Sequence, residues 1–161
     1  MIELSEKLLI NADVQTVWAF LTDVEKSLSF NRFHVEILLP NRFSVNNKSE
    51  FTIIHNFGFG NHEISANVIE YVATKRLLIS EKSKDDSLKG FPHEIEFSIL
   101  QEDNNTQLNY SVRGTYGGRV QDISFTPILK GVLKEEINKI KIAIESSEKI
   151  PENIKVGSIS P

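Results

Sequence analysis

The sequence has 161 residues, of which 40% are hydrophobic and 25% are charged, a composition typical of one globular domain. Its formal net charge is −4 and its Lys and Arg residues are scattered, so no basic surface for nucleic acid is expected. Cysteine is absent, no apolar run approaches the ~20 residues that span a bilayer, and no signal-peptide pattern follows Met1, so we expect a cytoplasmic protein without disulfides or integral membrane association.

The first thirty residues predict one strand followed by one or two short helices. Residues 2–10 alternate in part between apolar and polar side chains, as in a strand with one buried face. Asp13 precedes apolar residues at helical spacing, so we expect it to be the N-cap of a helix over 14–22. A further helical turn is expected within 25–30.

The central part of the chain predicts an antiparallel sheet, because apolar residues recur there with a period of two and turn residues separate the segments. Strands are expected at 35–39, 51–55, 62–73 and 77–82, with a chain reversal at 58–61. Glu70 interrupts the apolar series of its strand. It is either a buried carboxylate with a function or the sign of a β-bulge, and the neighbouring Ile69 and Tyr71 favour the bulge.

A hairpin and a long helix are expected to complete the fold. Apolar and polar residues alternate over 93–99 and again over 108–112, with a turn at 102–105, so these two segments predict a hairpin. An apolar residue then recurs at helical spacing from Leu129 to Ile144, which predicts a long amphipathic helix ending near residue 148. Pro127 either follows a Thr126 cap or lies at a kink in a helix that begins near residue 121; a kinked or two-part helix is favoured.

This order of elements predicts an α+β fold. Strands joined by short turns form an antiparallel sheet, and the apolar stripe of the long helix must be buried on one face of that sheet. We expect one domain over 1–149 and a loose C-terminal tail over 150–161.

Four segments of the chain resemble the START-related superfamily, also called SRPBCC, which includes lipid-transfer proteins and polyketide cyclase/dehydrase-like proteins. Residues 10–23 are similar to the first strand and first helix of that family. Residues 91–97 and 106–110, with the glycine-rich segment 114–118, are similar to its last hairpin and to the turn that leads into the long helix. The resemblance covers residues 2–148. It implies a helix-grip fold, in which a curved antiparallel sheet of about six to seven strands is wrapped around the long C-terminal helix.

The same resemblance implies an internal cavity for a hydrophobic small molecule, and period two indicates which side chains face it. His93 leads the inward-facing series of its strand, where it either orients a ligand, moves a proton, or is a structural histidine bonded to a nearby backbone group. His55 has the same alternatives. Tyr110 is expected to face the interior and Tyr116 to lie at the cavity rim. Apolar lining is expected from Ile95, Phe97, Leu129 and Leu133.

No metal and no cofactor are expected. His55, His62 and His93 match no familiar zinc spacing, and cysteine is absent. The glycine-rich segments 58–60 and 114–118 lack the spacing of nucleotide-binding loops.

Two functions from different classes therefore compete. The first is binding or transport of a lipid, polyketide or similar compound, which requires only the cavity. The second is a cyclase/dehydrase- or hydratase-type enzyme, in which a cavity residue such as His93 moves protons. A protein-interaction domain is a weaker alternative. The binder is favoured because no base with an orienting partner is visible, so no catalytic residue is assigned. The sequence gives no indication of an oligomeric state.

Overall fold

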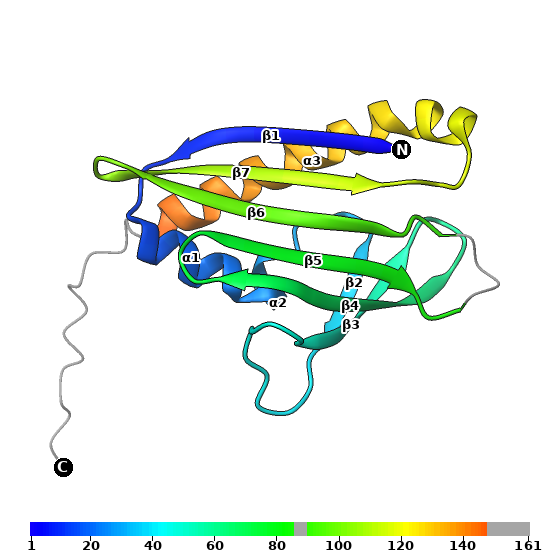
Figure 1. The fold of residues 1–161 in the computed structure, drawn as a ribbon, viewed down its shortest axis with the longest axis horizontal. Helices are drawn as coiled ribbons and strands as arrows, with labels where there is room; N and C mark the ends of the chain where they lie inside the picture. Colours follow the sequence, from blue (N-terminus) through cyan, green and yellow to red (C-terminus); the bar gives the residue numbers. More distant parts are fainter. Residues whose placement is uncertain (86–89, 148–161) are drawn as a thin grey trace, which may run out of the picture.

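The computed structural model describes residues 1–85 and 90–147, which form a seven-stranded antiparallel sheet and three helices (Figure 1). The strands follow one another across the sheet in the order β1-β7-β6-β5-β4-β3-β2. In chain order the elements are β1 (Ile2–Ile10), α1 (Val14–Thr22), α2 (Val24–Ser27), β2 (His34–Leu38), β3 (Glu50–Asn56), β4 (Asn61–Val72), β5 (Arg76–Ser83), β6 (His93–Glu102), β7 (Asn105–Gly114) and α3 (Arg119–Ser147).

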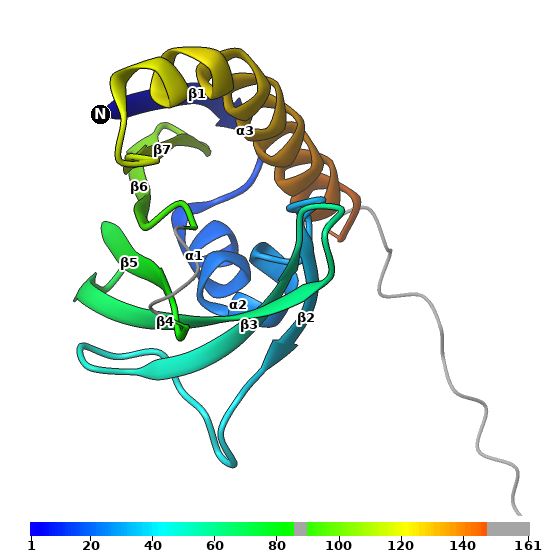
Figure 2. The same ribbon diagram turned by 90° about the vertical axis from the view of Figure 1, so that its right-hand side faces the viewer.

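The sheet is strongly curved, and the helices lie on its concave side. Figure 2 shows β1 and β7 at one end of the curve and β2 and β3 at the other, with α3 across the opening and α1 and α2 inside. This is the predicted α+β helix-grip architecture. The predicted tail 150–161 and the last two residues of the predicted domain, 148–149, lie outside the described residues.

Helix α1 covers its predicted range, whereas α2 (Val24–Ser27) is shorter than the predicted turn over 25–30 and α3 begins before its proline. The Asp13 carboxylate accepts a hydrogen bond from the Thr16 amide at 2.9 Å, so Asp13 is the N-cap of α1. Helix α3 starts at Arg119 and contains Pro127, so the alternative in which the helix begins before this proline is the one observed. Thr126 does not cap the helix. Its hydroxyl donates instead to the carbonyl oxygen of Asp122, one turn earlier, at 2.6 Å.

Two irregular features of β4 shape the sheet. The register of β4 against β5 shifts between Val68 and Glu70, which confirms the predicted β-bulge. Glu70 is half-buried and pairs with Arg76 at 2.7 Å. The reversal before β4 contains Gly58 and Gly60, whose φ angles of 96° and 104° favour glycine.

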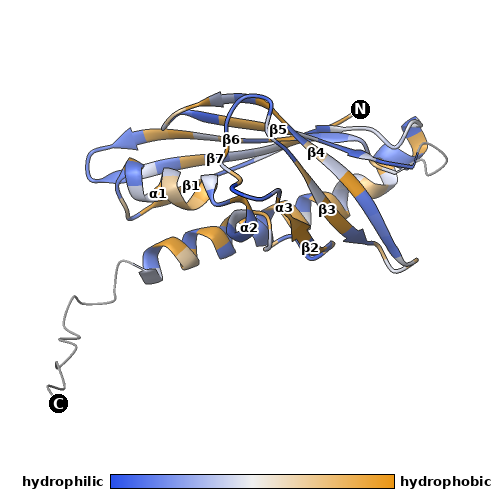
Figure 3. Ribbon diagram, turned by 90° about the horizontal axis from the view of Figure 1, so that it is seen from below, coloured by the Kyte–Doolittle hydropathy of each residue, from blue (hydrophilic) through white to orange (hydrophobic). Residues whose placement is uncertain are grey.

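The core lies between the concave face of the sheet and the three helices. Successive side chains of a strand point to opposite faces of the sheet, and hydrophobic and hydrophilic residues alternate along α3 (Figure 3). The buried side of α3 carries Val132, Leu133, Ile137, Ile140 and Ile144. Helices α1 and α2 contribute Trp18, Leu21 and Val24, which fill much of the space inside the curve. None of the helices within 1–85 and 90–147 is long and apolar enough to cross a membrane.

Candidate functional site

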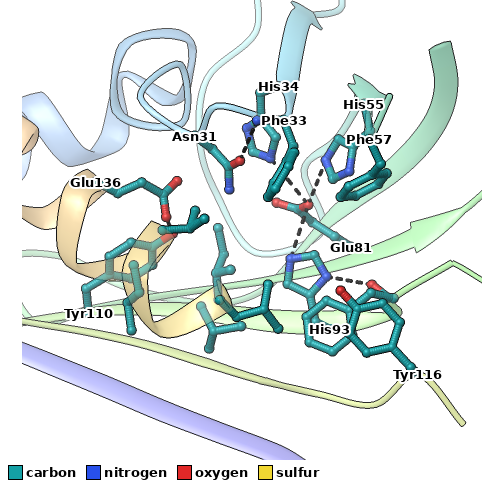
Figure 4. A pocket seen from close by; sticks show the side chains of 16 residues that line it. Asn31, Phe33, His34, His55, Phe57, Glu81, His93, Tyr110, Tyr116 and Glu136 are labelled. Carbon is teal, nitrogen blue, oxygen red and sulfur yellow. Dashed lines mark hydrogen bonds and ion pairs between the residues drawn. The ribbon is translucent and has the colours of Figure 1, made fainter. Parts of the chain in front are cut away.

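A small cavity lies between the concave face of the sheet and α3, and both polar and apolar side chains line it (Figure 4). Its volume is about 40 Å³, room for roughly three water molecules. Its walls come from β2, β3, β5, β6, β7, α3 and the segment that leads into β2. Ligand pockets usually measure ~300 Å³ or more, so the inner cavity is far smaller than a pocket for a hydrophobic ligand.

The polar centre of this cavity is Glu81, whose carboxylate is surrounded by three histidines. The alternation of β5 places Glu81 inward, on the same face as Leu77 and Ile79, and its side chain is only 1% exposed. The Nε2 atoms of the histidines approach Oε2 of Glu81 at 3.3 Å for His55, 3.4 Å for His93 and 3.8 Å for His34. Neither Glu81 oxygen has a hydrogen-bond donor among the described residues.

Two of the three histidines are fixed through their other ring nitrogen. Nδ1 of His34 lies 2.7 Å from the carbonyl oxygen of Leu28, and Nδ1 of His93 lies 2.7 Å from that of Phe91. Gly114 on β7 contributes to the placement of His93, because a Cβ atom at this position would lie 2.6 Å from Cβ of His93. Both histidines therefore present Nε2 to Glu81 (Figure 4).

Burial and mutual charge set the protonation of this cluster. Burial lowers the pKa of His34 to about 4, although the charge of Glu81 opposes this effect. Burial alone would raise the pKa of Glu81, but the charges of the neighbouring histidines, His93 first among them, lower it to about 2. At neutral pH the centre thus holds an ionised carboxylate next to a neutral His34.

A second polar pair lies on the α3 side of the same cavity. The hydroxyl of Tyr110 donates to Oε2 of Glu136 at 3.1 Å, and both residues are buried. Burial raises the pKa of Glu136 to about 8, and burial together with the Glu136 charge raises the pKa of Tyr110 as well. Glu136 is therefore mainly protonated at neutral pH, and the cavity contains one ionised and one neutral carboxyl group.

A larger outer pocket of about 280 Å³ lies next to the inner cavity. Its lining includes Phe57, Phe59, His62 and Ser83, and it shares His55, Phe57, Phe91 and His93 with the inner cavity. Phe59 is 89% exposed and Phe57 is 41% exposed, so aromatic rings border the solvent here. The two histidines shared by both spaces connect the outer pocket to Glu81.

Most of the side chains predicted to face the cavity do so. His55, His93, Ile95, Tyr110, Tyr116, Leu129 and Leu133 all line the inner cavity. Phe97 does not: its ring is fully buried and stacks on Tyr110 at a centroid distance of 4.6 Å, so it belongs to the core. His62 lines the outer pocket and is not part of the cluster around Glu81. Whether any of these residues contacts a ligand stays a prediction.

Sequence reasoning missed Glu81, His34 and Glu136, although two of them had a signal. Glu81 alternates in phase with Leu77 and Ile79 on a predicted strand, so it shares their buried face. Glu136 lies three residues after Leu133, on the apolar stripe of α3. His34 had none, because the predicted strand began one residue later and His34 joins the cluster only through the pairing of β2 with β3.

Comparison with known proteins gives a match at the level of structure alone. No family model matches the sequence, and no curated protein matches it. A conserved protein from Geobacillus kaustophilus superposes with a TM-score of 0.71 at 15% identity, covering 91% of this chain and 97% of that protein. The chain has the helix-grip fold. The fold predicted from the resemblance to START-related proteins is thereby confirmed.

Two further solved structures that superpose on this chain are described as aromatase/cyclases. The Zhui aromatase/cyclase from a Streptomyces species has a TM-score of 0.66 at 8% identity, with coverage of 92% of this chain and 96% of that protein. The di-domain aromatase/cyclase StfQ of the steffimycin biosynthetic pathway has a TM-score of 0.67 at 12% identity, with coverage of 91% of this chain and 51% of that protein. At these identities the likeness concerns the fold and carries no function by itself.

Proposed function

We propose that this chain binds an apolar small molecule that carries a polar group. The apolar part occupies the outer pocket, and the polar group lies against His55 and His93. The observation that carries the proposal is the outer pocket itself, whose volume of about 280 Å³ is close to the ~300 Å³ at which ligand pockets begin.

The lining of the outer pocket supports this assignment. Contiguous exposed apolar side chains often mark ligand-binding grooves, and Phe57 and Phe59 lie together at the border of the pocket. The histidines supply the few polar groups that fix a ligand's orientation in an otherwise apolar pocket. Because two helix-grip neighbours are described as aromatase/cyclases, a polyketide-like ring compound is the ligand class we favour.

A second candidate function is proton-transfer catalysis on such a compound. The observation in its favour is that the carbonyl oxygen of Phe91 orients His93 through Nδ1 at 2.7 Å, while Nε2, the atom that would exchange a proton, lies 3.4 Å from Glu81. His93 is also the most exposed of the three clustered histidines, with 11% of its side chain accessible. A ligand in the outer pocket would therefore meet this imidazole directly.

The test uses the fluorescent apolar probe anilinonaphthalene sulfonate with two serine variants of β5. Ser83 lines the outer pocket, so Ser83→Phe fills it, whereas Ser80 lies on the opposite face of the same strand and Ser80→Phe serves as the control. We expect one saturable site in the wild type and in Ser80→Phe, and affinity weakened by about tenfold or more in Ser83→Phe. Equal probe affinity in all three proteins would refute the assignment of the pocket.

A further inference from the structure

The cluster around Glu81 has the composition of a metal site. One ligand atom each from His34, His55 and Glu81 lies within 4.8 Å of the other two, and Nε2 of His93 adds a fourth at 3.4 Å from the same carboxylate oxygen. These side chains come from β2, β3, β5 and β6, and their exposed fractions are between 1% and 11%. Three imidazoles and one carboxylate are ligands that divalent transition metals prefer.

The orientation of two histidines suits the binding of an ion between them and Glu81. The carbonyl oxygens of Leu28 and Phe91 only accept hydrogen bonds, so the Nδ1 atoms of His34 and His93 carry the hydrogen. Nε2 is then the ring atom that each of these two histidines turns toward the carboxylate of Glu81. An imidazole Nε2 and a carboxylate oxygen that face each other in a buried site can bind one metal ion together.

The separations of the ligand atoms fit a bound ion. A tetrahedral zinc ion with bonds of ~2.1 Å holds its ligand atoms roughly 3.4 Å apart. The observed Nε2 to Oε2 distances are 3.3 Å for His55, 3.4 Å for His93 and 3.8 Å for His34. The bonds from Nδ1 to backbone carbonyls are also those that hold metal-ligating histidines in place.

We propose that Glu81, His34, His55 and His93 bind one divalent transition-metal ion, for which Zn²⁺ is the best match. The expectation of no metal drawn from the sequence concerned His55, His62 and His93. It included neither His34 nor Glu81, so it does not apply to this set of ligands. The proposal does not depend on a ligand in the outer pocket. The inner cavity, with a volume of about 40 Å³, has room for one ion together with one or two water molecules.

The experiment titrates the chelator-treated full chain with Zn²⁺ in a calorimeter and with Co²⁺ by visible absorption, with no organic probe present. We expect one ion per chain and a strong four-coordinate Co²⁺ spectrum. Removing a residue that hydrogen-bonds to a metal ligand lowers metal affinity ~10- to 100-fold. Glu81→Gln and His55→Gln each replace a ligand itself, so they should lower metal affinity ~100-fold or more. The matched control is His62→Gln, because His62 pairs with His55 in the sheet but lies outside the cluster.

Two results would overturn the proposal. The first is a wild type that takes up no stoichiometric Zn²⁺ or Co²⁺. The second is His62→Gln losing as much affinity as Glu81→Gln, which would place the ion in the outer pocket. Circular dichroism checks that each variant folds; His93→Gln, at the most exposed ligand, replaces any variant that does not. The metal titration uses no organic probe, so its result is independent of whether Ser83→Phe weakens probe binding. Each proposal can therefore be refuted without the other.

Discussion

Ionisation of Glu136 should lower the free energy of unfolding as the pH rises. Glu136→Gln should abolish this decrease in stability. The pKa of this carboxyl is about 8 in the folded protein and 4.5 in its ordinary state, so the folded chain keeps a proton that the unfolded chain releases. The stability contribution is complete below pH 4.5 and is lost progressively up to about pH 8. At ~1.4 kcal/mol per pH unit, the cost at pH 7 is roughly 3 kcal/mol.

The assay is urea unfolding of the wild type and of Glu136→Gln from pH 4.5 to pH 8.5. Gln keeps an acceptor for the hydroxyl of Tyr110 but does not ionise, so the two proteins should be similar in stability at pH 4.5. The variant should be more stable by roughly 3 kcal/mol at pH 7. Glu135→Gln is the control, because its partners Lys139 and Arg32 lower the pKa of Glu135. A stability difference that does not change with pH would refute the reasoning.

Three further predictions concern the helices and His93. Leu133→Asp buries a carboxylate without a partner at a position that is 2% exposed, so it should destabilise the domain by ~3 kcal/mol or more. The control is Ile142→Asp on the same helix, where the residue is 63% exposed and the melting temperature should remain nearly unchanged. Asp13→Ala removes the cap of α1 and should cost ~1 kcal/mol in urea unfolding; no change would mean that the bond to Thr16 is not needed. For the third, mass spectrometry of the purified protein first identifies the bound compound. His93→Gln should then weaken the binding of that compound by ~1 kcal/mol. A ~100-fold loss of turnover with unchanged affinity would favour the enzyme instead.

The fold could be predicted from the sequence because its signals are local. The cap at Asp13 and the alternation of the strands each depend on residues within a few positions of one another. The bulge at Glu70 was also visible, because two large apolar residues flank it. The start of α3 was less clear, since a proline within the first turns of a long helix permits more than one beginning.

The candidate site was predicted only in part because it depends on distant pairings. Period two correctly placed His55 and His93 on the buried face, but it could not show that both meet Glu81. That meeting depends on the curvature of the sheet and on the register of β3, β4, β5 and β6. The size of the cavity was likewise beyond the sequence, because it depends on how far Trp18 and its neighbours on α1 fill the curve.

The central claim, that the outer pocket holds the ligand against the histidines, is tested most directly by nuclear magnetic resonance. The chain has four histidines, so a proton–nitrogen spectrum of the imidazoles resolves each one. The chelator-treated protein is titrated with anilinonaphthalene sulfonate. The signals of His55, His62 and His93, which line the outer pocket, should shift with the same concentration dependence as the probe's fluorescence. Saturating fluorescence with these three signals unchanged would show that the probe binds elsewhere and would contradict the claim.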